Sequence, residues 1–359
     1  MPTPESPHWL VLFFAIAMPL TAIALVLLLV RSVRRSQRGS ARLRAGELFR
    51  LLGGRVAGRV PARTLRRAVS GAEHESFWDA MEAITTTLRL RERLELSRSL
   101  KRSGHVAHER RLLRSHEPAA RRELAARRLG FLPSTESRRA LRRALVRGPA
   151  NVSFAAARAL ARHRDLRALR WLLEHPAAVS SRPMPALSGL LRAFGPAARA
   201  MLIAALEQGL PDTRVECACI DSLGVARCRS ARGSIANRLR SPHLELRVAA
   251  ARALGRLGMG EAIPALAMAL TDESWPVRAM AAQALGRLAA SPAVDSLVAC
   301  VSDRSWWVRH HAAYALAAIG DEGRDALCEL AARSDDPYAR EMAREALDAA
   351  DLSGDVREA

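Results

Sequence analysis

The stretch that decides the fold reads LRVAAARALGRLG from Leu246, VRAMAAQALGRLA from Val277 and VRHHAAYALAAIG from Val308. One phrase thus recurs at a constant interval of 31 residues. A fixed period between about 20 and 50 residues is typical of proteins built from stacked repeats. An arginine and a leucine keep their places in every copy. These are Arg247, Arg278, Arg309 and Arg340, and Leu254, Leu285, Leu316 and Leu347.

The spacing within each copy predicts two antiparallel helices. The first opens at the Val-Arg pair, and small residues such as Ala281 allow its neighbour to approach closely. The second carries apolar residues at helical spacing, for example Leu266 and Leu270. Asp272 and Asp303 precede later first helices and are expected to cap them. Glycines are expected to let the backbone leave the first helix; they are Gly255, Gly258, Gly286 and Gly320.

The same register extends towards the amino terminus. Leu129, Leu160, Leu191 and Leu223 continue the leucine series, with one extra residue before the last of them. A single helix pair cannot bury its apolar face alone, whereas stacked pairs share one continuous core. The sequence therefore predicts an all-α fold: an α-solenoid of antiparallel helix pairs. It would occupy residues 118–350, after an atypical helical cap of two helices (76–117) and before a polar tail (351–359).

The repeated phrase, V-R-x-x-A-A-x-A-L-G-x-[LI]-G with an aspartate before it, resembles HEAT repeats. The short bacterial form of this repeat is also found in phycobilin lyases. The likeness covers about residues 118–350 and is strongest from Leu244 to Ala350. It implies a right-handed superhelix that serves as a scaffold for partners. It also implies a structural ladder of ion pairs between turn aspartates and the repeat arginines, broken where Glu216 takes the arginine position. Its members would be Arg247, Arg278, Arg309, Arg340, Asp272 and Asp303.

An apolar segment lies near the amino terminus. Residues 9–30 read WLVLFFAIAMPLTAIALVLLLV and contain no charged side chain. A helix of that length would extend about 33 Å, enough for the hydrocarbon core of a bilayer. A cleaved signal peptide is the alternative, but no basic residue precedes the apolar run. We expect a single transmembrane helix over residues 9–30.

The charges beside this segment predict its orientation. Glu5 is the only charged side chain before it, whereas arginines follow it closely. Positive residues stay on the cytoplasmic side, so residues 1–8 would be extracytoplasmic and the solenoid cytoplasmic, at the inner membrane. Residues 31–75 would form a basic linker with one short helix around residues 42–52, lying among anionic headgroups or acting as a flexible spacer. The membrane-proximal basic residues are Arg31, Arg34, Arg35, Arg38, Arg42 and Arg44.

The charge balance changes along the chain. Residues 31–130 hold 25 basic and 10 acidic side chains, whereas residues 251–359 hold 11 and 17. This asymmetry favours an anionic surface or partner for the first half. Nucleic-acid binding in a basic groove is the alternative function, although aromatic residues are scarce there and a membrane segment argues against it. The arginines concerned are Arg121, Arg122, Arg127, Arg128, Arg138, Arg139, Arg142 and Arg143.

The five cysteines have neither a disulfide-framework spacing nor a zinc-site spacing. Cys219 falls in an alanine position of the repeat and Cys328 in a leucine position, so both are expected to be buried and inert. Free thiols are typical of a reducing compartment. The histidines of the cap, His105, His108 and His116, lack an HExxH arrangement and are expected to be solvated or capping.

Catalytic motifs are lacking as well. The sequence contains no nucleophile elbow, Walker motif or dinucleotide fingerprint. The likeness to bilin lyases concerns only the repeat scaffold, and a fold does not imply a function. We therefore expect no enzyme, no cofactor and no metal, with a lyase-like activity as a further alternative.

The turns before two first helices carry tryptophans: DESWPVR from Asp272 and DRSWWVR from Asp303. Such rings either pack beneath the adjacent turn or form an exposed anchor for a partner. The predicted partner-binding residues are Trp275, Trp306, Trp307, His310, His311 and Tyr314. Together these observations predict a membrane-anchored cytoplasmic scaffold or adaptor that binds a partner protein, such as an envelope enzyme or signalling protein.

Overall fold

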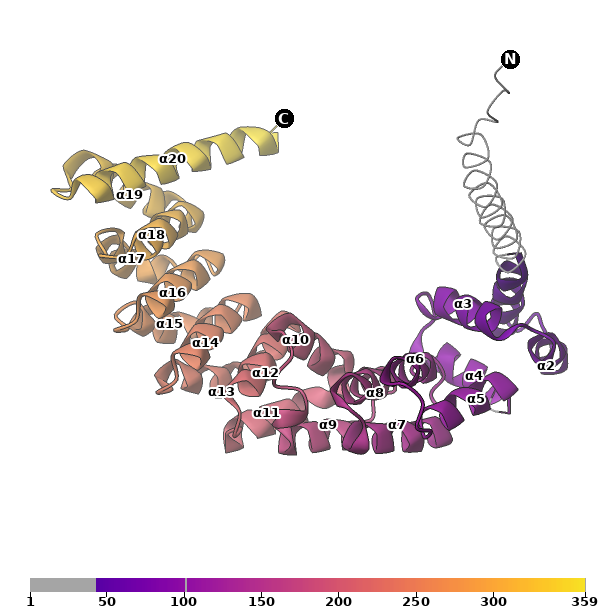
Figure 1. The fold of residues 1–359 in the computed structure, drawn as a ribbon. Helices are drawn as coiled ribbons and strands as arrows, with labels where there is room; N and C mark the ends of the chain where they lie inside the picture. Colours follow the sequence, from indigo (N-terminus) through magenta and orange to yellow (C-terminus); the bar gives the residue numbers. More distant parts are fainter. Residues whose placement is uncertain (1–42, 101, 359) are drawn as a thin grey trace, which may run out of the picture. The chain divides into compact units, whose positions relative to one another are not determined.

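The computed structural model describes residues 43–100 and 102–358 (Figure 1). Within these residues every regular element is a helix, which agrees with the predicted all-α class. The described chain forms two compact units, divided between Ala140 and Leu141. The extracytoplasmic segment 1–8, the transmembrane helix predicted over 9–30 and the basic residues from Arg31 to Arg42 lie outside the described residues.

Length and apolar composition decide whether a helix of the described chain can cross a membrane. No single helix there combines the length and the apolar composition needed to cross a bilayer. One pair bent by 101°, Met184–Ala193 with Pro196–Gln208, meets the length and composition criteria when its two halves are taken together.

The first unit contains more helices than the sequence predicts. The helix expected around residues 42–52 is present and extends over residues 43–56. A further helix, α2, lies in what was expected to be linker, and Leu48, Leu52 and Leu65 of these two helices are buried. These segments therefore belong to the fold of the first unit. The labelled helices are α2 (Ala62–Ser70), α3 (His74–Thr85), α4 (Leu90–Leu100), α5 (Gly104–Leu112), α6 (Ala119–Leu129) and, across the unit boundary, α7 (Thr135–Arg147).

The predicted cap consists of three helices rather than two. Helix α3 ends at a run of three threonines, where the Thr87 hydroxyl donates to the carbonyl of Ile84. Such local side-chain bonds compete with helix continuation. Helix α4 ends at Leu100, and α5 begins at Gly104. Phe77 and Trp78 of α3 are buried.

A polar cluster is buried in this first unit. Glu109 is fully buried, and its Oε1 lies 2.8 Å from His74 Nε2 and accepts from Arg128 Nη1 at 2.9 Å. The two rings of His74 and His105 meet at Nδ1 atoms 3.1 Å apart. Burial lowers the pKa of His105, although a hydrogen bond to the carbonyl of Val69 acts in the opposite direction. His105 is thus a packed residue, contrary to expectation, whereas His108 and His116 are exposed.

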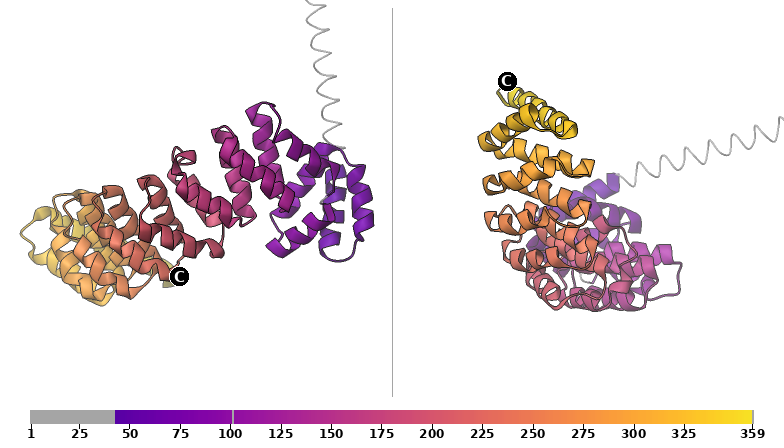
Figure 2. Two further views of the ribbon diagram at one scale, coloured as in Figure 1. Left: turned by 90° about the horizontal axis from the view of Figure 1, so that it is seen from below. Right: turned by 90° about the vertical axis from the view of Figure 1, so that its left-hand side faces the viewer.

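The second unit is a stack of helix pairs. First helices from α12 to α20 contact one another in chain order, and the second helices form a neighbouring row (Figure 1). The layering of successive pairs is visible from two further directions in Figure 2. First helices are α8 (Ala150–Arg162), α10 (Met184–Ala193), α12 (Thr213–Val225), α14 (Leu244–Leu257), α16 (Trp275–Arg287), α18 (Trp306–Ile319) and α20 (Pro337–Glu358). Second helices are α9 (Leu166–Glu174), α11 (Arg199–Gln208), α13 (Arg232–Asn237), α15 (Ile263–Ala269), α17 (Val294–Val301) and α19 (Asp321–Arg333).

The leucine series forms the core of the repeats as predicted. Its members from Leu129 to Leu316 are buried. Leu347 is only half-buried, because no further described helix covers α20 beyond the last pair.

Two of the glycines have a different role from the one expected. Gly255 and Gly286 lie inside α14 and α16 and do not end them. A Cβ atom at Gly255 would lie 2.8 Å from both Cα and Cβ of Ala284, and one at Gly286 would lie 2.8 Å from Cα of Ala315. Glycine is therefore needed so that neighbouring first helices can meet at backbone contact. We call each such contact a glycine–alanine seam.

The chain leaves most first helices through one residue of positive φ. Gly258 (φ 69°) and Gly320 (φ 101°) confirm the expectation for those two glycines. The equivalent position of the repeat between them is Ala289, with φ 46°. This exit position recurs with the repeat spacing, including the one extra residue before the fourth copy of the leucine series. Its occupants are Arg164, Gly195, Arg227, Gly258, Ala289 and Gly320.

Four of the five cysteines are buried, including Cys219 in its alanine position. Burial raises the pKa of Cys217 to about 11 and that of Cys300 to about 11, which keeps these thiols protonated and unreactive. Cys328 is exposed, so its prediction was wrong. In the last pair α19 follows Gly320 directly, without the short 3₁₀ turn of earlier pairs, and Leu327 faces the core instead.

Candidate functional site

The repeat arginines hold the turns in place. Each donates from Nη1 to the carbonyl of the residue six positions earlier, for example Arg278 to Asp272 at 2.8 Å and Arg309 to Asp303 at 2.9 Å. Arg278 also binds the carboxylate of Asp303, one repeat further on, with Nε–Oδ2 and Nη2–Oδ1 distances of 2.7 and 2.9 Å. Arg247 pairs in the same way with Asp272, at 2.9 Å. A guanidinium thus ties its own turn to the next one.

The turn aspartates complete this arrangement. Asp272 Oδ1 accepts from the backbone N–H of Ser274 at 2.9 Å, and Asp303 Oδ1 from that of Ser305 at 2.8 Å. The capped N–H groups belong to the residues just before α16 and α18, so the aspartates cap the turns rather than the helices themselves. Burial raises the pKa of Asp303, but bonds from Arg278 and Ser305 outweigh this and hold the pKa below its ordinary value.

The ladder changes at both ends. Glu216 occupies the arginine position of α12 and pairs with Arg238, with Nε–Oε1 at 2.5 Å, instead of a turn aspartate. At the other end, Ser334 stands where the next aspartate would be. Arg309 lies over the ring of Tyr338, 5.4 Å from its centre. Two of the predicted rungs are therefore ion pairs, Arg247–Asp272 and Arg278–Asp303, while Arg309 and Arg340 bind backbone carbonyls.

The tryptophans of these turns are exposed to solvent. Trp275 opens α16 and is 46% exposed, while Trp306 and Trp307 open α18 and are 45% and 52% exposed. Beneath them, Val277 and Val308 are fully buried. The helix begins two residues before the Val-Arg pair, so the valine faces the core and the tryptophans lie on the outer side of the first turn. They do not pack beneath the turns.

The rings on α18 stack on each other. Trp306 and His310 lie parallel with centroids 4.8 Å apart, and His310 is 4.3 Å from the ring of Tyr314. Trp307 meets Trp306 edge-on at 5.0 Å and lies above His311 at 6.4 Å. Residues three and four apart share one helix face, which explains this order. The structure thus brings five of the six predicted partner-binding residues into one cluster.

Two members of the cluster have pKa values that differ from their ordinary ones. Burial lowers the pKa of His311, and the neighbouring His310 acts in the same direction. His311 is therefore uncharged at neutral pH. Burial also raises the pKa of Tyr314, whose hydroxyl lies 3.3 Å from Oε1 of Glu345 on α20. The surface that this cluster presents is mainly aromatic.

Sequence reasoning missed one aromatic residue of this surface. Tyr338, in the first turn of α20, is 64% exposed and lies exactly one repeat after Trp307. The repeat interval alone could have revealed it. Leu244 opens α14 one repeat before Trp275 and is also partly exposed. We call Trp275, Trp306, Trp307 and Tyr338 the aromatic row; they lie on α16, α18 and α20, which pack against one another in order.

The basic residues of the first half are less available for binding nucleic acid than their number suggests. Half of the eight arginines carry ion pairs: Arg121 with Glu117, Arg127 with Glu123, Arg128 with Glu109 and Glu75, and Arg142 with Asp165. Of the membrane-proximal arginines, Arg44 is described, and it pairs with Glu73 at 3.4 Å. Within the described chain no group of three or more His, Cys, Asp or Glu side chains could hold a metal ion.

A profile of the HEAT-repeat family matches residues 199–276 and, again, residues 264–348. These matches coincide with the helix pairs from α11 to α20. This part of the chain is therefore similar to HEAT repeats, in agreement with the resemblance of the repeated phrase. No curated protein sequence matched the chain.

Several solved structures are similar to the chain. An engineered protein is 20% identical, covering 85% of this chain and 98% of its own, with a TM-score of 0.37. The complex of CpcE and CpcF of phycocyanin lyase from Nostoc sp. PCC7120 is 22% identical, covering 42% and 98%, with a TM-score of 0.33. A designed armadillo repeat protein in complex with the peptide (KR)4 is 18% identical, covering 52% and 98%, with a TM-score of 0.35.

Proposed function

We propose that the chain is a non-enzymatic scaffold that binds a partner protein through the aromatic row and the adjoining rings of His310, His311 and Tyr314 on α18. The observation that carries the proposal is the exposure of Trp275, Trp306 and Trp307 on consecutive repeats. Large rings left in water cost free energy, and tryptophan and tyrosine are the commonest anchors of protein interfaces. Equivalent positions on packed helices lie about 8–10 Å apart, so the row could follow an extended segment or a helix of the partner.

The chemistry of the row favours an apolar or aromatic contact with a polar rim. His311 is uncharged at neutral pH, and Glu273 and Arg304 flank the tryptophans as exposed charges of opposite sign. An apolar centre within a polar rim is the usual anatomy of an interface. The ion-pair ladder lies beneath and fixes the turns that carry the rings. The backbone that carries Trp275, Trp306 and Trp307 is thus held in place before any partner binds, which reduces the entropy lost on binding.

The proposal includes a membrane location. The apolar segment 9–30 would anchor the chain in the inner membrane with its solenoid in the cytoplasm, and the partner would be an envelope enzyme or a signalling protein. The support is the uncharged length of the segment and the arginines that follow it.

The test is a capture experiment with the full chain. Wild type and the double variant Trp307→Ala/Tyr314→Ala would be used as bait on detergent-solubilised membranes, with quantitative mass spectrometry of the bound proteins. We expect the variant to lose the specific partner by tenfold or more, since truncating a central aromatic anchor costs about 2 kcal/mol or more. Its unfolding free energy should fall by only about 1 kcal/mol, because both side chains are partly exposed.

The matched control removes exposed apolar side chains from elsewhere in the same unit. Met268→Ala/Val225→Ala changes residues that are 64% and 44% exposed and lie outside the row. Capture by this control should equal that of wild type. Equal loss of capture and of stability in the Trp307/Tyr314 variant would mean that the rings serve the fold, and the proposal would then be abandoned.

A further inference from the structure

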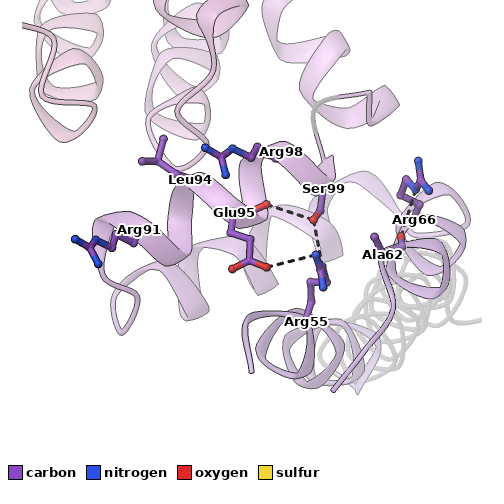
Figure 3. Close-up of a pocket in the computed structure, with 8 residues that line it drawn as sticks. All are labelled: Arg55, Ala62, Arg66, Arg91, Leu94, Glu95, Arg98 and Ser99. Atoms are coloured by element: carbon purple, nitrogen blue, oxygen red, sulfur yellow. Dashed lines mark hydrogen bonds and ion pairs between the residues drawn. The ribbon is translucent and has the colours of Figure 1, made fainter. Parts of the chain in front are cut away.

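A basic pocket lies in the first unit, whereas the aromatic row belongs to the second unit. It has a volume of about 710 Å³ and lies between the helix over residues 43–56, α2 and α4 (Figure 3). Pockets of this size commonly hold small molecules or headgroups. Its lining residues are Arg55, Ala62, Arg66, Arg91, Leu94, Glu95, Arg98 and Ser99.

Helical spacing places the charges of α4 together. Arg91, Glu95 and Arg98 follow one another at intervals of four and three residues, which puts them on one face of the helix. Arg66 reaches the same space from α2. Four arginines therefore surround the pocket against one carboxylate. A concave surface lined by charges of one sign concentrates the field and attracts ions of the opposite sign.

The single carboxylate already has a partner. Glu95 Oε1 lies 3.4 Å from Nη2 of Arg55, whose Nε donates to the hydroxyl of Ser99 at 3.2 Å (Figure 3). In the described chain, no carboxylate lies within ion-pair distance of Arg66, Arg91 or Arg98. These three guanidinium groups contrast with Arg121, Arg127 and Arg128 of the same unit, each of which has an ion pair.

A second pocket of about 420 Å³ shares part of its lining with the first. Arg66 and Ser99 line both, and Arg67, Arg102 and Ser103 add further donors. The combined space exceeds what a single phosphate ion needs. It fits a ligand with an anionic head and additional atoms.

We propose that this pocket binds a phosphate-bearing group through Arg66, Arg91 and Arg98. Guanidinium groups present several N–H donors in a planar fork that matches phosphate oxygens, and they are always charged. Ser99 supplies a hydroxyl beside them. The same chemistry fits the headgroup of an anionic phospholipid and a soluble phosphate ester. The site does not depend on the aromatic row or on a protein partner.

The experiment uses the full chain and two sources of phosphate. In the first arm, pyrophosphate is titrated into the chain in a neutral detergent, and binding is followed by calorimetry. In the second arm, the chain is placed in nanodiscs of phosphatidylcholine with or without phosphatidic acid, and the thermal unfolding midpoint is compared. Binding in the first arm identifies a soluble ligand. A higher midpoint with phosphatidic acid alone identifies a lipid headgroup.

The variant Arg66→Gln/Arg91→Gln/Arg98→Gln should weaken the binding seen in either arm by tenfold or more, because bonds to charged groups are the strong ones. The control Arg111→Gln/Arg139→Gln/Arg143→Gln removes the same charge from exposed helical positions outside the pocket. It should leave binding within about twofold of wild type. Equal losses in both triple variants would mean that only net charge matters, and would overturn the proposal.

A variant that binds phosphate more tightly gives a further test, because partial unfolding can only weaken binding. Glu95→Gln removes the competing carboxylate and releases Arg55, so phosphate binding should tighten by about threefold or more. The Glu95 side chain is about half exposed and its distance to Arg55 is 3.4 Å, so losing this pair should cost little stability. Unchanged or weaker binding in Glu95→Gln, or no phosphate binding by wild type in either arm, would overturn the proposal.

Discussion

Ala289 has a backbone conformation that suits glycine better than alanine. Its φ is 46°, in the left-handed region, and it occupies the exit position that Gly258 holds one repeat earlier. An L-residue there costs about 1 kcal/mol or more, because its Cβ crowds the backbone. The bond from the N–H of Ala290 to the carbonyl of Leu285, at 3.2 Å, closes the helix and holds Ala289 in place.

Replacement of Ala289 by glycine should therefore stabilise the protein. We expect a gain of roughly 0.5–1 kcal/mol, since relief of the left-handed strain exceeds the extra chain entropy of glycine when unfolded. The measurement is urea-induced unfolding followed by circular dichroism. The reciprocal change Gly258→Ala serves as control; a Cβ there would meet no atom within 4 Å, so its cost is conformational. If Gly258→Ala were as stable as wild type, the exit position would not require positive φ.

At the scale of elements, the glycine–alanine seams set how closely first helices pack. At each seam a missing Cβ on one helix meets an alanine on the next, as at Gly255 and Ala284. Backbone atoms cannot move aside as a flexible side chain can, so an added methyl group must push the helices apart. Overpacking of this kind costs about 1–3 kcal/mol, which exceeds the gain in helix propensity from glycine to alanine.

The variant Gly255→Ala should therefore be destabilised, by about 1 kcal/mol or more in urea unfolding. The compensating change Ala284→Gly returns the lost space. The double variant should thus be more stable than the sum of the two single changes predicts, with a coupling of about 1 kcal/mol. As a control, Gly233→Ala in α13 adds a Cβ that meets nothing within 4 Å and should be neutral or stabilising. Additive effects at the seam would contradict the close-contact explanation.

Periodicity made much of the repeat architecture predictable. Leucine positions such as Leu285 and the exit at Gly258 follow from the interval and from the chemistry of each position. The two ion-pair rungs at Arg247 and Arg278 were implied by the resemblance to HEAT repeats. The role of Gly255 could not be predicted from the interval. A glycine near the end of a helix is expected to end that helix, unless the contact with the neighbouring helix is known. The buried cluster around Glu109 also left no pattern, since its members come from α3, α5 and α6 and are joined only by folding.

The aromatic row, too, could be predicted from the sequence only in part. The turn residues could be listed from the sequence, but whether Trp306 and Trp307 were buried depended on where α18 begins. The helix starts at Trp306, two residues before the Val-Arg pair. That shift places Val308 in the core and the rings outside. Tyr338 was not predicted, because its turn contains no tryptophan and has Ser334 in the position of Asp272 and Asp303.

At the scale of the whole molecule, a native thiol can report the proposed membrane orientation. Cys328 is exposed, whereas the other four cysteines are buried. A membrane-impermeant maleimide should therefore label wild type in inverted inner-membrane vesicles and not in intact spheroplasts, if the solenoid is cytoplasmic. The chain should also resist extraction with carbonate. Cys328→Ser should abolish the labelling. Labelling from outside, or release by carbonate, would contradict the proposed anchor and orientation.

The exit positions have a consequence for how the array comes apart. In a stacked-repeat protein each repeat contributes its own stability plus contacts with its neighbours, so opening can begin locally. Glycine exits at Gly258 and Gly320 are relaxed, whereas those at Arg164, Arg227 and Ala289 carry left-handed strain. Relaxed and strained joints therefore alternate along the second unit. We expect the solenoid to open locally in blocks of two repeats. The boundaries between these blocks would lie at the exit positions that are not glycine, namely Arg164, Arg227 and Ala289.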